Sequence, residues 1–193
     1  MRRLLVGVVA ASLMLVGIAG PATARAPQAA PAPGDATIAE IADAAGFDLL
    51  LTAVGYIAET NPDSALIEGL LNDDQYTVFA PTDQAFEDLL DAVGLAGSTD
   101  PFGDIDAALG PGTVEAVVSY HVTEGRRAAN SVVPPRGERT ITTLLPGATF
   151  TVDTGAEITA VGNTANITAA NVSASNGVIH VIDAVILPVD LEL

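Results

Sequence analysis

The chain has 193 residues, 49% of them hydrophobic, and carries 24 acidic against 7 basic side chains, a net charge of −17 with both histidines neutral. This hydrophobic content excludes an intrinsically disordered chain, and the negative charge makes sequence-independent binding to nucleic acid or anionic lipid unfavourable. Because there is no cysteine, disulfides, thiolate metal sites and thiol nucleophiles are excluded, and the length favours one domain.

The N-terminal residues have the pattern of a secretory signal peptide. Two arginines precede an uncharged stretch, Leu4–Ala24, which ends in the small-residue triplet Ala22-Thr23-Ala24. We predict a signal peptide over residues 1–24, with cleavage after Ala26 and retention as a membrane anchor as the alternatives. The mature protein would then lie outside the cytoplasmic membrane, secreted or in the cell envelope, with no membrane insertion after cleavage.

A spacer and a first helix are predicted next. Residues 25–36 are rich in proline and alanine without apolar periodicity, which is typical of a flexible or polyproline-like spacer. The folded domain is predicted over residues 37–190. Thr37 and Glu40 have the spacing of a capping box, so a helix should begin there and end at Gly46.

Two further helices are predicted in the first third of the chain. Apolar residues at helical spacing continue through Leu50–Ala58. Asn61 followed by Pro62 fits an N-cap with proline at the first helical position. The short helix expected there should carry Leu66, Leu70 and Leu71.

A strand, a turn and a helix follow. Tyr76–Ala80 is rich in β-favouring residues and is stopped by Pro81, after which Thr82 can cap a helix. The apolar face of that helix consists of Phe86, Leu89, Leu90 and Val93. We predict a loop over Gly94–Gly103 and another helix over Pro111–Tyr120.

From about residue 139 the pattern changes to period two. Strands are predicted over Thr149–Val152, Ile158–Val161, Ile167–Val172 and Val178–Leu187, separated by turn residues, which indicates an antiparallel meander. The last strand is apolar on both faces and should be covered on both sides. Helices followed by strands predict an α+β domain or a sandwich with added helices.

Three segments resemble the fasciclin domain family. Thr77–Phe86, which reads TVFAPTDQAF, is similar to the first signature block, and Asn176–Pro188 is similar to the second. Between them, Tyr120-His121-Val122 followed by Glu124-Gly125 resembles the tyrosine-histidine segment of the family. The resemblance extends from about Thr37 to Pro188.

The resemblance implies a wedge-shaped, seven-stranded β-sandwich with helices packed along it. It also implies a noncatalytic role, because the family is associated with cell adhesion, extracellular matrix and secreted or surface-anchored bacterial proteins. In animal members the tyrosine-histidine segment is implicated in integrin binding, together with bulky aliphatic neighbours. The neighbours here, Val117, Val118 and Val122, are smaller, which argues against a literal integrin role.

Two adjoining segments are candidates for partner binding. Tyr120 and His121 could lie on a rim that contacts a partner, or could be satisfied side chains at the end of a core-facing helix. The four domain arginines could dock a carboxylate, a sulfate or an acidic polysaccharide, or could only neutralise neighbours such as Glu124 and Glu138. These arginines are Arg126, Arg127, Arg136 and Arg139.

His180 is predicted to have a structural role. Asp183 is three residues further along the strand and therefore points to the opposite face, so the two cannot form a simple pair. A buried imidazole needs a hydrogen-bond partner, and we predict a polar link from His180 to the Thr82-Asp83 turn.

No strong catalytic or metal-binding pattern is present. Asp100, Asp104 and Asp106 lack the late bidentate Glu of an EF-hand, and two histidines cannot build a three-histidine zinc site. The sequence contains no G-x-S-x-G, H-E-x-x-H or phosphate-binding glycine loop. We therefore expect no metal, no cofactor and no enzyme activity.

The function predicted from the sequence is a secreted, monomeric adhesion or matrix-interaction module. Its partner would be a cell-surface or matrix protein or an acidic glycan. The alternative is an extracytoplasmic binder of a small hydrophobic or acidic ligand, which a deep apolar pocket would support. An enzyme would require a cleft that pairs His121 or His180 with a nucleophile.

Overall fold

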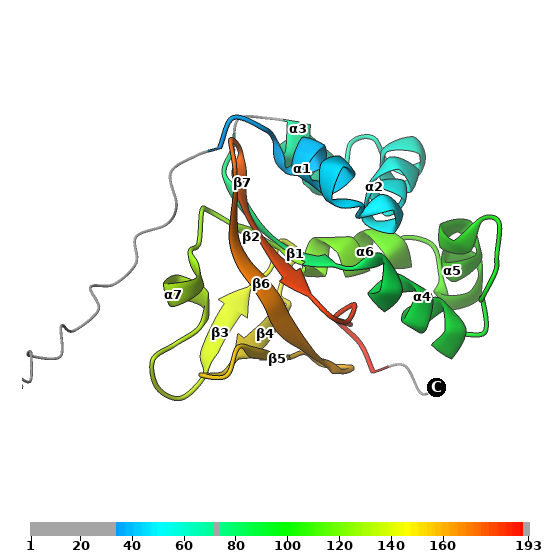
Figure 1. The fold of residues 1–193 in the computed structure, drawn as a ribbon. Coiled ribbons are helices and arrows are strands. Elements are labelled where there is room, and N and C mark those ends of the chain that lie inside the picture. Colours follow the sequence, from blue (N-terminus) through cyan, green and yellow to red (C-terminus); the bar gives the residue numbers. More distant parts are fainter. Residues whose placement is uncertain (1–33, 72–73, 191–193) are drawn as a thin grey trace, which may run out of the picture.

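The computed structural model describes residues 34–71 and 74–190, which form a layer of helices against a strongly curved sheet (Figure 1). The helices are α1 (Ile38–Ala45), α2 (Asp48–Thr60), α3 (Ala65–Leu71), α4 (Asp83–Ala92), α5 (Pro101–Leu109), α6 (Thr113–Tyr120) and α7 (Ala129–Val132). The strands are β1 (Tyr76–Pro81), β2 (Val122–Glu124), β3 (Arg139–Thr142), β4 (Thr149–Val152), β5 (Glu157–Thr159), β6 (Thr164–Ala174) and β7 (Gly177–Ile182). The α+β class is confirmed.

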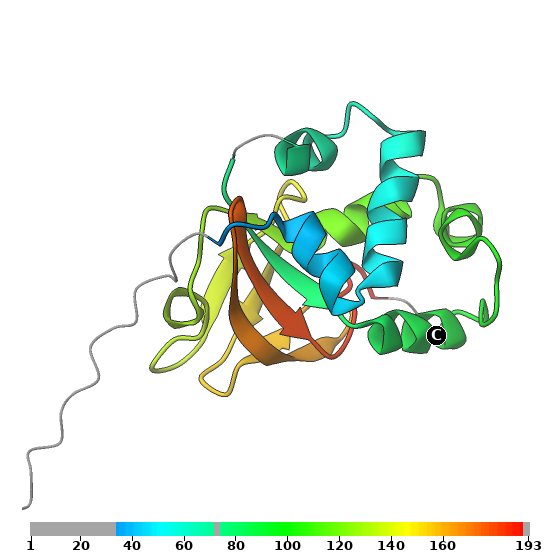
Figure 2. The same ribbon diagram turned by 45° about the horizontal axis from the view of Figure 1, so that its top comes forward.

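The seven strands form one sheet in the order β2-β1-β7-β6-β5-β4-β3. The predicted meander is confirmed, since each strand from β3 to β7 pairs antiparallel with the next. The pairing of β1 with β7 is parallel and joins segments about a hundred residues apart. Figure 2 shows these two strands side by side, with helices α1 to α6 along one side of the sheet.

The sheet folds back on itself along β6. The register of β6 against β7 shifts between Ile167 and Val172, and Asn171 has a positive φ of 64°, so the strand bends there. At the far ends the two edges meet, because Leu144 N–H donates to the Val122 carbonyl at 2.7 Å. The sandwich implied by the family resemblance is therefore a single, almost closed sheet.

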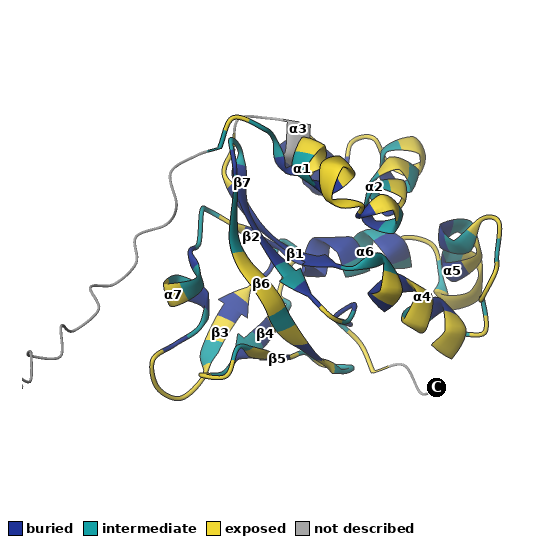
Figure 3. Cartoon of the chain, in the orientation of Figure 1, coloured by how far each residue is buried: buried dark blue, intermediate teal, exposed yellow. Residues whose placement is uncertain are grey.

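Two hydrophobic cores lie on the two faces of β1 and β7. One core is inside the curved sheet, where the rings of Phe79 and Tyr120 both pack edge-on against Phe150. The other lies between the helices and the outer face, to which Val78 and Ile179 contribute. Strand β7 is buried on both faces, as predicted (Figure 3).

Local capping signals place two helices as predicted. Thr37 and Glu40 form a complete capping box on α1, which ends at Gly46 in the left-handed conformation with φ 75°. Thr82 caps α4, its hydroxyl accepting the Ala85 N–H at 3.3 Å. These signals work because donor and acceptor are only three residues apart.

Three local predictions were wrong. Asn61 is not an N-cap: Pro62 lies in a turn, and α3 begins only at Ala65, where the Ser64 hydroxyl accepts the Leu66 N–H at 3.2 Å. The predicted loop Gly94–Gly103 ends earlier, because α5 begins at Pro101.

The Asp100 carboxylate caps α5 by accepting the Gly103 N–H at 3.2 Å. Strand β7 also ends sooner than predicted, at Ile182, and the buried residues Val185–Leu187 continue as a non-strand segment.

Some predictions lie outside the described residues. These are the signal peptide over 1–24, nearly all of the 25–36 spacer, and the burial of the Leu70 and Leu71 side chains. The described chain begins with Gly34, whose N–H donates to the Ala174 carbonyl at 3.2 Å. The domain limits 37–190 stay a prediction.

Gly177 at the start of β7 should not tolerate a side chain. A Cβ there would overlap the Tyr76 carbonyl oxygen of the paired strand, and a backbone atom cannot move aside. We expect Gly177→Ala to lower the free energy of unfolding by about 1–3 kcal/mol in urea. The matched control is Gly55→Ala on α2, where no atom lies within 4 Å of the new Cβ and helix propensity should raise stability by up to about 1 kcal/mol. Equal effects of both substitutions would contradict the steric argument.

Candidate functional site

Tyr120 and His121 face the interior, so the predicted contact rim is not formed. Tyr120 ends α6 with a relative exposure of 0%, and its hydroxyl donates to the Thr149 carbonyl at 2.8 Å. His121 is 2% exposed. The face of α6 that carries Val114 and Val118 is turned toward the core. Tyr120 at the end of this helix and His121 just after it are buried as well.

The His121 ring joins α6 to the segment after β7. Its Nδ1 lies 2.7 Å from the Val117 carbonyl, and its Nε2 lies 3.0 Å from the Ile186 backbone nitrogen. A backbone N–H can only donate, so Nε2 accepts and Nδ1 carries the proton. Burial lowers the pKa of His121 from 6.5 to about 4, partly offset by the hydrogen bond to Val117. The ring is therefore neutral and structural.

His180 is also held by backbone groups. Its Nε2 donates to the Arg127 carbonyl at 3.0 Å, and its Nδ1 accepts the Asn171 N–H at 3.4 Å. Burial is the main cause of its lowered pKa. The ring stacks at a tilt on Phe79, the residue opposite it in the parallel register, with centroids 5.5 Å apart.

The predicted link from His180 to Thr82 and Asp83 is wrong. The Thr82 hydroxyl caps α4, and the Asp83 carboxylate accepts the Leu49 N–H at 3.1 Å and so ties α4 to α2. The parallel register places His180 opposite Phe79, three residues before Thr82. Only the backbones meet, through the Thr82 N–H and the Ile182 carbonyl at 3.2 Å.

Arg126 differs from the other three arginines in its hydrogen bonds. The Arg126 Nη1 donates to the carbonyls of Ala174 at 2.8 Å and Gly177 at 2.6 Å, which fixes the turn between β6 and β7. Arg126 is therefore a structural residue. Its carbonyl acceptors belong to the turn, and no partner of the protein is needed to explain its position.

The remaining three lie around α7 at the surface, and we call them the arginine surface: Arg127, Arg136 and Arg139. Arg127 precedes α7, Arg139 begins β3 and donates to the Asn130 carbonyl of α7 at 3.3 Å, and exposed Arg136 lies in the connecting loop. Residues 125–152 contain four arginines and one acid, Glu138. The segment is a local positive region on an acidic chain.

The carboxylates of Asp100 and Asp106 act as helix caps, a role that the sequence analysis missed. Asp106 accepts the N–H groups of Gly112 at 3.1 Å and Val114 at 2.9 Å and the Tyr56 hydroxyl at 3.1 Å, which caps α6 from α5. Within residues 34–71 and 74–190, no three acids or histidines are grouped to hold a metal ion. No helix in those ranges has the length and apolarity to cross a membrane.

Two apolar hollows flank α6, and the sequence pattern predicted neither of them. The larger, about 350 Å³, lies between α1, α2 and strands β1 and β2. The smaller, about 40 Å³, lies between α4, α5 and the segment after β7. Such hollows depend on how the helices and strands pack together, which the spacing of apolar residues along the sequence does not predict.

Comparisons with known proteins agree on one family. A model described as the fasciclin domain matches residues 52–188. Protein sll1483 of Synechocystis is 36% identical over 156 residues, covering 79% of this chain and 73% of that protein.

Two proteins of Mycobacterium bovis are also similar. The immunogenic protein MPB70 is 32% identical over 67% of this chain and 58% of its own length, and the cell surface glycolipoprotein MPB83 is 34% identical over 66% and 50%. This chain thus spans half to three fifths of these two relatives. A FAS1 domain pair from the insect cell adhesion molecule fasciclin I has a TM-score of 0.45 at 16% identity, covering 72% of this chain and 45% of that one.

The neutral His121 should make stability fall in acid. Its folded pKa lies below the unfolded value, so the unfolded chain binds the proton first, and stability present above pH 6.5 is lost as the pH falls toward about 4. The difference corresponds to about 3 kcal/mol. Urea unfolding across this range should show a smaller loss in His121→Gln, which lacks the titrating ring, than in the native chain. Parallel curves for the two would contradict the assignment.

Proposed function

The chain belongs to the fasciclin domain family, and from this membership we propose that it is a noncatalytic surface-interaction module that acts outside the cytoplasmic membrane. The name of its relative MPB83 places that protein at the cell surface. Both histidines are engaged in structural hydrogen bonds to backbone groups, and the chain has no cysteine to serve as a nucleophile. These observations favour binding over catalysis.

The observation that carries the proposal is the arginine surface. Its side chains are exposed or half-buried and lie just before α7, in the loop after it and at the start of β3. Guanidinium groups can bind carboxylates or sulfates in a bidentate manner, so the partner is a cell-surface or matrix protein or an acidic glycan. On a chain with a charge of −17, an anionic partner would favour this arginine-bearing side over the acidic surfaces.

The test is a triple substitution, Arg127→Gln, Arg136→Gln and Arg139→Gln, which leaves the structural Arg126 in place. Binding to immobilised heparin and to whole cells should weaken by about tenfold at low salt, with a smaller salt dependence. The matched control replaces the same three arginines by lysine, which keeps the charge and should retain part of the binding. Unchanged binding by the glutamine variant would show that these arginines only neutralise their neighbours.

The larger hollow supports a second candidate function, the binding of a small hydrophobic molecule. Its volume of about 350 Å³ is within the usual range of ligand pockets. The lining is aliphatic apart from Thr37 and Asn176: Ile38, Ala39, Ala42, Leu50, Leu51, Val54, Val78, Val118 and Val122. Among the described residues no charged side chain lines it, which favours a neutral apolar ligand over the acidic one.

A neutral fluorescent probe, N-phenyl-1-naphthylamine, tests this second function. We expect its fluorescence to rise on binding, and Ala42→Leu, which fills the hollow from α1, to weaken binding by about tenfold. The control is Ala169→Leu at an exposed site on β6. No fluorescence rise with the native chain, or equal binding by the Ala42→Leu variant and the control, would remove this candidate.

A further inference from the structure

The exposed large apolar side chains gather at one end of the molecule. Among the described residues they are Leu109, Val161 and Val189, with relative exposures of 45%, 62% and 52%. Leu109 and Val189 line the same hollow. Val161 precedes Gly162, whose N–H donates to the Leu187 carbonyl at 3.2 Å and where an added Cβ would overlap the Val189 carbonyl oxygen. Exposed apolar residues that cluster in this way mark interaction sites.

The hollow at this place is a narrow slot of about 40 Å³. Its walls include Phe86 and Leu89 of α4, Val93 just after it, Leu109 of α5, Val117 of α6 and Val189. None of the described residues that line it is charged. The space suits one aliphatic side chain entering between the helices.

A second, shallower hollow of about 230 Å³ adjoins the slot and shares Leu89 and Leu187 with it. The carboxylates of Asp88 and Asp183 line this hollow, and both side chains are exposed. We call the slot and this hollow together the acid-edged slot. It sets an apolar anchoring position directly beside two negative charges.

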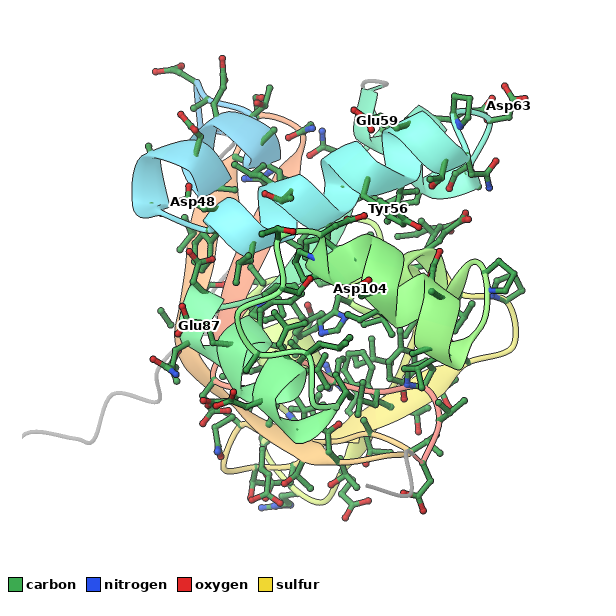
Figure 4. The ribbon with its side chains drawn as sticks, turned by 90° about the vertical axis from the view of Figure 1, so that its right-hand side faces the viewer. Asp48, Tyr56, Glu59, Asp63, Glu87 and Asp104 are labelled. Atoms are coloured by element: carbon green, nitrogen blue, oxygen red, sulfur yellow. The ribbon has the colours of Figure 1, made fainter. Side chains whose placement is uncertain are left out.

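The wider surroundings are also negative. Residues 35–125 and 140–190 contain no lysine or arginine. Exposed Glu87 on α4 and Asp104 on α5 lie on this side of the molecule (Figure 4). A second copy docking through the same face would bring carboxylates against carboxylates, and an anionic lipid surface would be repelled.

We propose that the acid-edged slot binds a cationic amphipathic segment of a partner protein. An aliphatic side chain of that segment fills the slot, and a neighbouring lysine or arginine pairs with Asp88 and Asp183. The arginine surface lies around α7 and β3, at the opposite end from α4 and α5 (Figure 1). The two surfaces are independent, so one molecule can join a basic partner to an acidic one.

The test uses the purified full chain and a labelled amphipathic helical peptide of leucine and lysine, followed by fluorescence anisotropy. We expect saturable binding that weakens with salt, and no comparable binding of a leucine-glutamate or a serine-lysine peptide. Leu109→Asn with Val189→Asn should weaken binding by about tenfold, and Asp88→Asn with Asp183→Asn should reduce both affinity and salt dependence.

The controls are matched to each pair. Ala169→Asn with Ala170→Asn changes exposed apolar residues on β6, and Asp43→Asn with Glu59→Gln removes two exposed charges from α1 and α2. Both should bind the peptide as the native chain does. Equal loss in a control pair, equal binding of the serine-lysine peptide, or self-association abolished by Leu109→Asn with Val189→Asn would overturn the proposal. The arginine variants leave this assay unchanged, which separates it from the proposed function.

Discussion

The parallel pairing of β1 with β7 is the constraint on which the rest of the structure depends. These strands are the second and third of the seven in the sheet and are buried on both faces, so each must be covered by helices on one side and by the curved sheet on the other. The first and second signature segments of the family run along these strands. The segments that resemble the family therefore coincide with strands that are buried on both faces, where substitution of a side chain would disturb packing.

The same constraint explains why the tyrosine-histidine segment is internal. The chain leaves α6 and pairs at once with β1 through Val122, and the Phe79 N–H donates to the His121 carbonyl at 2.8 Å. The side chains of Tyr120 and His121 beside this strand are buried, so their polar atoms must find hydrogen-bond partners within the protein. His121 meets this need with backbone groups at both ring nitrogens.

Sequence reasoning succeeded where the deciding contact is short-range. The capping box of Thr37, the cap at Thr82 and the bounds of β4 were predicted correctly, because each depends on a few adjacent residues. The same kind of signal misled at Asn61-Pro62 and was overlooked at Asp100-Pro101, because tertiary packing decided which proline began a helix. The partners of His180 are backbone atoms from distant segments, which no residue pattern identifies.

The meeting of the two sheet edges has a consequence for the behaviour of the protein in concentrated solution. Open strand edges present unpaired backbone groups that recruit other chains and begin aggregation. Here the edge strands β2 and β3 are three and four residues long, and the Thr123 hydroxyl and the Leu144 N–H bridge the gap between the two edges. The backbone groups of the two edge strands are therefore poorly available for pairing with another molecule, although the chain has no disulfides. Electrostatic repulsion between molecules of the same negative charge further opposes aggregation.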